Sequence, residues 1–225
     1  MKNELNVNER TRLPLSLERV LGAAIATADQ LGLDSLTMRG LARDLGVEPM
    51  SLYYYVANKD QLLNAMLDRV MSEIELPPDS VAWRPALRSL ALSAHAVLEA
   101  HQWAAGYVMS AARLGPNRMR FMDAMLGRLR EAGFPPGTID LAYHALDSHI
   151  VGASLWALSV SPGLNGQPGG ADPRELARDF LRSLPDGLPN LADHVEYHLS
   201  TTAVDSSFEF GLDLLLEGIE KLRQG

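Results

Sequence analysis

The stretch from residue 36 to residue 59 contains two short amphipathic segments joined by one glycine, and it restricts the fold more than any other part of the chain. Thr37 precedes apolar residues spaced along one face of a helix, so its hydroxyl can cap the first free amides. Gly46 follows the last apolar position, where helices often turn left-handed. Pro49 suits the first turn of another helix. The pattern therefore predicts two short helices joined by a tight turn.

The second of these helices is predicted to carry an unusual number of outward-facing tyrosines. Leu52 and Val56 are four residues apart and can pack inward, which turns their neighbours outward. Phenol hydroxyls that reach phosphates and rings that cover sugars or thymine methyls suit a helix in a DNA groove. In the alternative interpretation one tyrosine belongs to the core and the others cover a neighbouring helix. For Tyr55 the two interpretations are equally balanced.

A third helix is predicted to begin directly after this segment. Asn58 can cap it, with Gln61 as the reciprocal partner, and Lys59 stands in its first turn. A cation at that position opposes the helix dipole, but it would share a bound phosphate with the free amides. The alternative is an ordinary solvated lysine.

The run from Leu36 to Lys59 resembles the DNA-binding domain of TetR-family transcriptional regulators. The resemblance is ungapped over about the first seventy residues. Beyond them it extends only to the helical plan and a few short sequence matches. It implies an all-α homodimer that binds a palindromic double-stranded DNA operator and releases it when a small-molecule effector enters the C-terminal domain. The positions that match the family's DNA contacts are Thr37, Arg39, Met50, Ser51, Tyr53, Tyr54, Tyr55 and Lys59. Many members have a histidine at the position of Tyr55 and polar residues at Pro49 and Met50.

The domain organisation follows from apolar periodicity and from proline breaks. Residues 1–15 lack periodicity and read as a flexible N-terminal arm. Residues 16–75 are predicted to form a three-helix helix-turn-helix DNA-binding domain with a linker helix that ends before Pro77. Residues 76–225 are predicted to form a larger helical ligand-binding and dimerisation domain, with helices over 82–100, 102–114, 116–132, 136–159, 173–184 and 206–222 and a loop over 161–171.

Two of these helices are candidates for a dimer interface. The helix over 136–159 combines small residues, among them Ala145 and Gly152, with apolar ones. The last helix carries a wide apolar stripe, made of Phe208, Leu212, Leu215, Ile219 and Leu222. Paired with their symmetry mates, the two helices would form a four-helix bundle. The alternative is that both are core helices of a monomer.

Aromatic, thioether and isolated polar residues gather in the middle helices and indicate a ligand cavity. An apolar chamber with a few polar groups is typical of a small-molecule site, and methionine adapts to varied shapes. The candidate ligand-binding residues are His101, Trp103, Tyr107, Met109, Phe121, Met125, His144, Asp147 and Trp156. Ordinary core packing is the alternative for each of them taken singly.

The composition excludes several classes of protein. The chain has no cysteine, so disulfides and thiolate metal sites are absent, and no apolar run approaches the length of a membrane span. These features favour a cytoplasmic protein without a membrane segment. The formal net charge of −8 argues against nucleic-acid binding, but residues 1–70 carry only −1 of it. Phosphate affinity depends on the local patch more than on the total.

Motifs for catalysis or for a cofactor are lacking, so we expect neither an enzyme nor a cofactor. His194 and His198 could share a helix face, but no third ligand accompanies them, and we expect no metal site. A DNA-binding regulator that is released by a small, largely apolar effector is the leading hypothesis. The alternatives are a helical DNA-binding regulator controlled by a protein partner and, less favoured, an all-α enzyme that uses His144, Asp147 or His149.

Overall fold

The computed structural model describes residues 14–110, 114–160, 173–185, 187–200 and 207–223, and every regular element among them is helical. The N-terminal elements are α1 (Leu17–Leu31), the 3-10 turn η1 (Leu33–Ser35), α2 (Met38–Leu45), α3 (Pro49–Leu52) and α4 (Lys59–Met71). They are followed by α5 (Trp83–Ala100), α6 (Gln102–Ser110), α7 (Pro116–Glu131), α8 (Pro136–Val160), α9 (Pro173–Ser183), α10 (Pro189–Ser200) and α11 (Ser207–Leu222). The predicted all-α class is confirmed.

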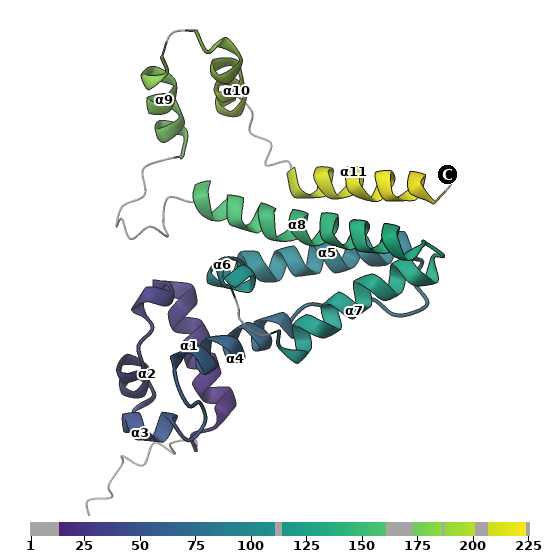
Figure 1. Ribbon diagram of the computed structural model, residues 1–225. Helices are drawn as coiled ribbons and strands as arrows, with labels where there is room; N and C mark the ends of the chain where they lie inside the picture. The colour runs from purple at the N-terminus through teal and green to yellow at the C-terminus, as the bar shows by residue number, and fades with distance from the viewer. Residues whose placement is uncertain (1–13, 111–113, 161–172, 186, 201–206, 224–225) are drawn as a thin grey trace, which may run out of the picture.

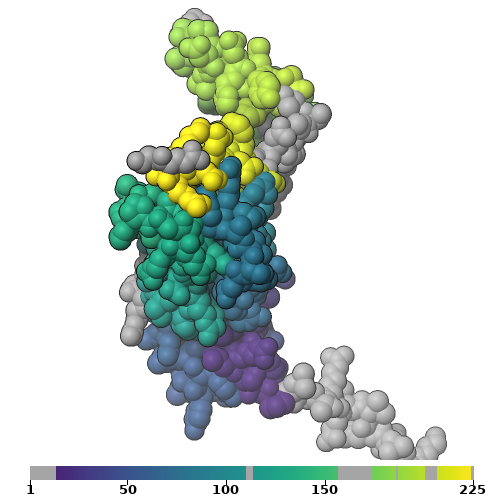
Figure 2. Space-filling model, turned by 90° about the vertical axis from the view of Figure 1, so that its right-hand side faces the viewer, coloured from purple at the N-terminus to yellow at the C-terminus, as the bar shows by residue number. Residues whose placement is uncertain are grey.

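The small N-terminal unit of α1 to α4 lies at one end of an elongated molecule (Figures 1 and 2). Helices α1 and α2 begin and end where the sequence predicts, whereas α4, predicted to reach about residue 75, ends at Met71. The Ser16 side chain accepts a hydrogen bond from the Arg19 amide at 3.2 Å, and Gly32 ends α1 with a φ of 79°. The buried side chains of α1, including Val20 and Ala24, meet those of α2 and α4 in one core. A helix-turn-helix too short to be stable alone thereby gains a third helix to pack against.

The C-terminal helices form a layered bundle around α5 and α8. Helices α7 and α11 both pack on α5 and α8, and α6 contacts α5 and α8 as well (Figure 1). The largest fully buried side chains here include Phe121, Met125, Leu129 and Leu146. Ion pairs between α5 and α11 reinforce the outer layer, because Arg88 contacts both Asp213 and Glu209.

Two partly buried sets of contacts fasten α7 to α4 and to the segment between α4 and α5. Arg128 donates hydrogen bonds to the carbonyls of Pro77 and Pro78, each at 2.8 Å, and so fixes the proline-containing linker. At the other end of α7, Asp68 of α4 accepts hydrogen bonds from the backbone and the side-chain amide of Asn117, at 2.8 and 2.9 Å. Any movement of α7 along its axis is therefore transmitted directly to α4.

Helices α9 and α10 form a hairpin that stands beyond the C-terminal end of α8 (Figures 1 and 2). The sequence interpretation included α9 but missed α10, in which only Val195 is buried. The predicted arm over residues 1–15 falls outside the described residues up to residue 13, and so does the predicted loop over 161–171. The division into domains at residues 15 and 75 stays a prediction.

The predicted dimer stripe on the last helix is wrong at three positions. Phe208, Leu212 and Ile219 are buried within the chain itself, because this side of α11 covers α5 and α8. A different set of large apolar side chains on α8 and α11 is exposed, namely Leu141, Leu155, Trp156, Phe210, Leu214 and Leu222. We call this set the exposed α8–α11 face.

Candidate nucleic-acid interface

Three local features fix the turn between α2 and α3. The Thr37 hydroxyl accepts a hydrogen bond from the Gly40 amide at 3.0 Å and caps α2. Gly46 has left-handed dihedrals of 68° and 36°, which a side chain would make costly. Pro49 occupies the first turn of α3. The turn geometry predicted from the sequence is thus confirmed, although α3 has only four residues and ends at Leu52.

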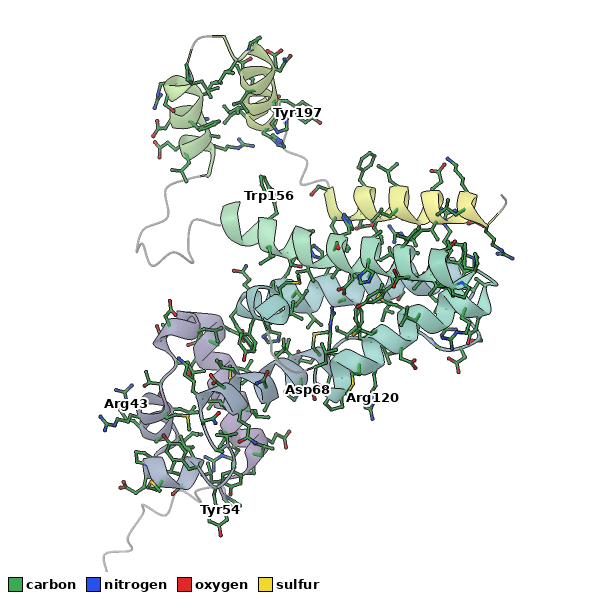
Figure 3. The ribbon with its side chains drawn as sticks, viewed as in Figure 1. Arg43, Tyr54, Asp68, Arg120, Trp156 and Tyr197 are labelled. Atoms are coloured by element: carbon green, nitrogen blue, oxygen red, sulfur yellow. The ribbon has the colours of Figure 1, made fainter. Side chains whose placement is uncertain are left out.

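The outer side of α3 and the turn after it expose large side chains that a structural helix would bury. Tyr54 is 94% exposed and Met50 is 75% exposed, whereas Leu52 between them is fully buried. Tyr54 projects from the end of the N-terminal unit, away from the rest of the molecule (Figure 3). Ser51 and Tyr53 are also exposed beside them. Because Leu52 is anchored in the core, the exposed residues on either side of it can insert into a groove without rearranging the core.

Tyr55 has a different environment from the two tyrosines before it. It is half-buried against the core, and its hydroxyl donates a hydrogen bond to the Leu15 carbonyl at 2.7 Å. This contact holds the residues that precede α1 against the turn after α3. The position favours a structural role for Tyr55, which was one of the two interpretations left open by the sequence.

Cationic side chains flank the projecting ones. Arg39 and Lys59 are exposed, and neither has a carboxylate partner in the described part of the chain. Asn58 accepts a hydrogen bond from the Gln61 amide at 2.8 Å and caps α4, while the Gln61 side chain accepts one from the Ala57 amide. Lys59 therefore stands beside the free amides of a helix start, which is an arrangement suited to phosphate.

The candidate ligand-binding residues occupy several separate environments. Phe121 and Met125 lie in the core, 1% exposed, whereas Met109, His144 and Trp156 are on the surface. Trp156 projects from the end of α8 toward the side where the hairpin stands (Figure 3). His101 and Trp103 both contact Asp29 of α1. The predicted residues are therefore not brought together around one cavity.

Asp147 and Tyr107 are also engaged rather than open to solvent. Asp147 of α8 forms a buried ion pair with Arg118 of α7, with contacts at 2.7 and 2.8 Å. Arg118 also lies over the ring of Phe121, 5.2 Å from its centroid. Burial raises the pKa of Tyr143 next to this pair and likewise that of Tyr107, so both phenols stay neutral near pH 7.

A small cleft between α4 and α7 is lined by residues that the sequence did not single out. Its volume is about 10 Å³, which is room for roughly one water molecule. Its walls are Asn64, Leu67, Asp68, Val108, Leu114, Gly115 and Arg118. The buried Oδ1 atom of Asn64 has no hydrogen-bond partner within the described residues. This cleft combines an unsatisfied acceptor with apolar walls directly on the linker helix.

Two family matches together extend from α1 to α11. Residues 20–66 match the bacterial regulatory proteins of the tetR family, and residues 76–223 match the tetracyclin repressor-like C-terminal domain. The chain belongs to the TetR family. TetR-family membership makes it a DNA-binding transcriptional regulator and not an enzyme, as the sequence predicted.

Similar proteins cover nearly the whole chain. The transcriptional repressor DrrR1 of Streptomyces coeruleorubidus is 34% identical over 213 residues, which are 92% of this chain and 78% of the relative. The TetR-family protein ActR of Streptomyces coelicolor, in complex with actinorhodin, is 29% identical with a TM-score of 0.75, over 95% of this chain and 100% of that one. A TetR variant from Acinetobacter baumannii, in complex with minocycline, is 26% identical with a TM-score of 0.64, over 94% and 100%.

Other features of this TetR-family chain bear on the remaining expectations. No helix of the described segments is long and apolar enough to cross a membrane. His194 and His198 make an edge-on ring contact on α10, and the described residues contain no group of three or more candidate ligands that could hold a metal. Asp29, Asn64 and Asp68 escaped the sequence interpretation. Of these three residues, only Asp29 could have been noticed in the sequence, because an acidic residue near a helix C-terminus is unfavourable beside the helix dipole and therefore indicates a compensating contact.

Proposed function

We propose that the protein is a repressor that binds a palindromic DNA operator as a homodimer and is released by a small, largely apolar effector. The observation that carries operator binding is the contrast within α3, where buried Leu52 anchors a segment whose neighbours Met50 and Tyr54 project into solvent. Exposing so much aromatic and thioether surface on a rigid unit is unfavourable unless a partner covers it. A bacterial operator is such a partner, and we infer that the protein acts in the cytoplasm.

The side chains on this surface divide into two roles. We assign base reading to Arg39, Met50, Ser51 and Tyr54, which are exposed around α2 and α3. We assign phosphate contacts to Lys59 and Tyr53, since Lys59 stands at a capped helix start and phenol hydroxyls reach phosphates. Thr37 can add a phosphate contact only through its remaining lone pair, because its hydroxyl oxygen already caps α2.

The homodimer is supported by the exposed α8–α11 face. On α8 the exposed positions include Leu141, Gly152 and Leu155, and the half-exposed Ala145 lies on the same side. Small residues between large apolar ones let two helices approach closely. A second copy would cover this surface and place two α3 segments for successive major grooves, about 34–36 Å apart.

An effector site next to α4 is supported by the cleft and by the similar proteins. Actinorhodin and minocycline are bound by the two structural neighbours, which supports a small-molecule effector larger than a few atoms for this chain as well. A cleft of about 10 Å³ cannot hold such a molecule without opening. Opening would separate α7 from α4, where Asp68 and Asn117 are bonded, and would move the DNA-binding domain.

Selection of bound sequences from random DNA tests the operator proposal. We expect a two-fold symmetric site, and Arg39→Ala should relax one position in each half. A recovered site without symmetry would refute the homodimeric mode. Release of this site by a candidate effector in a gel shift then separates the effector hypothesis from control by a protein partner.

A cleft-filling variant tests the location of the effector. Val108→Trp would place a large ring at the wall of the cleft beside α4, and we expect a stable dimer with a blunted ligand response. Ala145→Trp serves as a control on the proposed interface and should impair dimerisation instead. Full ligand response in a stable, dimeric Val108→Trp protein would place the effector elsewhere.

A further inference from the structure

Four side chains form a polar cluster where the DNA-binding domain meets the C-terminal helices. We define the Asp29 cluster as Asp29 of α1, Glu73 after α4, His101 between α5 and α6, and Trp103 of α6. Both carboxylate oxygens of Asp29 lie 3.0 Å from His101 Nδ1, and Trp103 Nε1 donates a hydrogen bond to Asp29 Oδ1 at 2.8 Å. His101 Nε2 lies 3.2 Å from Glu73 Oε2. One imidazole thus connects three separate parts of the chain.

The cluster is fixed on its C-terminal side by the backbone. The amide of His101 donates to the Val97 carbonyl and ends α5, while its own carbonyl accepts from the Ala104 amide and starts α6. Trp103 is nearly buried, with 9% of its surface exposed. Asp29 therefore bonds to two side chains whose backbone is held at the junction of α5 and α6. These bonds orient α1 relative to α5 and α6.

The position of Asp29 in the sequence costs local stability. It lies in the last turn of α1, where the partial negative charge of the helix end disfavours a carboxylate, and that turn has no basic residue. The contacts that offset this cost are made by His101 and Trp103 of the other domain. A carboxylate that served only solubility would not need hydrogen bonds from both His101 and Trp103.

We propose that the Asp29 cluster is the joint that holds the DNA-binding domain in its operator-binding orientation, with Asp29, His101 and Trp103 acting as positioning residues. This inference rests on the proposed operator binding. The two C-terminal members belong to the start of α6, and Val108 near its end lines the cleft beside α4. An effector that displaces α6 would pull on the same joint, so the cluster connects the effector site to α1.

His101 lies between two carboxylates from different elements. Its Nδ1 faces Asp29 of α1, and its Nε2 faces Glu73 after α4. Arg69 of α4 pairs with the other oxygen of Glu73, so that carboxylate is itself held in place. On α5, Glu99 pairs with His95 instead. One imidazole therefore links α1 to the segment after α4, and replacing it removes both contacts.

A distance measurement within one chain tests the joint without reference to dimerisation. The sequence has no cysteine, so Arg43→Cys and Arg120→Cys, both on outward-facing side chains (Figure 3), give two unique labelling sites on opposite sides of the joint. We expect a narrow distance distribution in the parent protein. Asp29→Asn and His101→Leu should each broaden it, because each weakens or removes contacts across the joint.

Matched variants separate positioning from folding. Glu99→Gln removes a carboxylate beside a histidine within a single helix and should behave as the parent protein. Trp103→Phe deletes one hydrogen bond but keeps the ring, so it tests the joint even if Asp29→Asn is unstable. In unlabelled proteins, Asp29→Asn should lower operator affinity by roughly tenfold, within the range of coupled sites.

The outcomes decide between the joint and the operator proposal. An unbroadened distribution in folded Asp29→Asn and Trp103→Phe would overturn the joint, and so would a broadened distribution with unchanged operator affinity. If the parent protein selects no operator at all, the proposed function fails, while the distance distributions still decide whether the cluster orients the domain.

Discussion

Two surfaces of the molecule expose large apolar side chains, but the groups that surround those side chains differ. Around α3, Met50 and Tyr54 project beside the exposed cations Arg39 and Lys59. On the exposed α8–α11 face, Phe210 and Leu214 are accompanied by small residues and by charges that are already paired, such as Lys221 with Glu217. The first surface suits a polyanion with grooves, and the second suits another apolar protein surface.

The two surfaces also differ in what holds them in shape. The α2–α3 surface is fixed by caps and a glycine turn within a stretch of about twenty residues. The α8–α11 face depends on contacts between distant segments, such as Arg84 with Glu220 and Arg88 with Asp213. Exposure alone therefore does not identify a partner, whereas exposure together with the nature of the neighbouring groups does.

The largest expected effect comes from charging the exposed α8–α11 face. We expect Phe210→Glu combined with Leu214→Glu to yield monomers and to lower operator affinity by about two orders of magnitude or more, because the second half-site contact is then no longer intramolecular. Sedimentation velocity and a gel shift would measure both. Met119→Glu, at an exposed apolar position on α7, is the matched control and should leave the dimer intact. If the double variant stayed dimeric, the exposed α8–α11 face would not be the dimer interface, and the proposed difference between the two surfaces would be wrong.

A smaller effect is expected from truncating the most exposed tyrosine. Tyr54→Ala should weaken operator binding by roughly 1–3 kcal/mol and relax one position of the selected site, if the ring reads a base edge. The matched variant Tyr55→Phe deletes the hydroxyl that bonds Leu15, and should reduce folding stability by about 1 kcal/mol with base preference unchanged. Equal changes in base preference for both variants would contradict the different roles of the two neighbours.

A still smaller effect is expected for one cation at the edge of the DNA surface. Lys59→Ala should weaken binding to all sequences alike and reduce the slope of log K against log salt by about one. Lys221→Ala on α11 removes another exposed lysine, which lies outside the DNA-binding domain. Its slope should equal that of the parent protein, and an unchanged slope for Lys59→Ala would argue that this lysine is merely solvated.

The DNA-binding domain could be predicted in more detail than the C-terminal domain because its decisive interactions are local. Ser16, Thr37 and Asn58 each cap a helix through an amide three residues ahead, so the spacing alone indicates the contact. The aromatic cluster assigned to one cavity failed as a unit, since partners far apart in sequence decide where each member lies. Trp103 meets Asp29, for example, 74 residues earlier.

Helix α10 and the orientation of α11 were missed because apolar periodicity alone resolves neither of them. Helix α10 has few buried positions, so its apolar periodicity is weak. On α11 apolar residues occur on both sides, and periodicity cannot tell which side meets the chain's own core. Phe208 is buried while Phe210 is exposed, although they are two residues apart.

The smallest effect that we predict concerns pH and separates the two domains. All six histidines lie after residue 94, so none belongs to α1 to α4. In the C-terminal helices, the ring of Phe208 on α11 is stacked between His95 and His149, with centroid distances of 3.9 and 4.8 Å. Burial lowers the pKa of His95, and His149 lowers it further, although Glu99 opposes the shift.

The sign of the pH effect follows from this lowered pKa. As pH falls through the ordinary histidine value of about 6.5, the unfolded chain takes up a proton before folded His95 does. Folding stability should therefore be unaffected by His95 above that pH, and should decrease below it until the folded-state pKa is reached. His95→Gln, which keeps a polar partner for Ser154, should flatten this part of the curve.

Hydrogen exchange at several pH values would show where the stability is lost. We expect acidification below about pH 6.5 to speed exchange in α11 before it does so in α1 to α3, because Phe208 is the anchor between the two imidazoles. Simultaneous loss of protection in both domains, unaltered by His95→Gln, would show that the C-terminal domain has no acid-sensitive contact of its own.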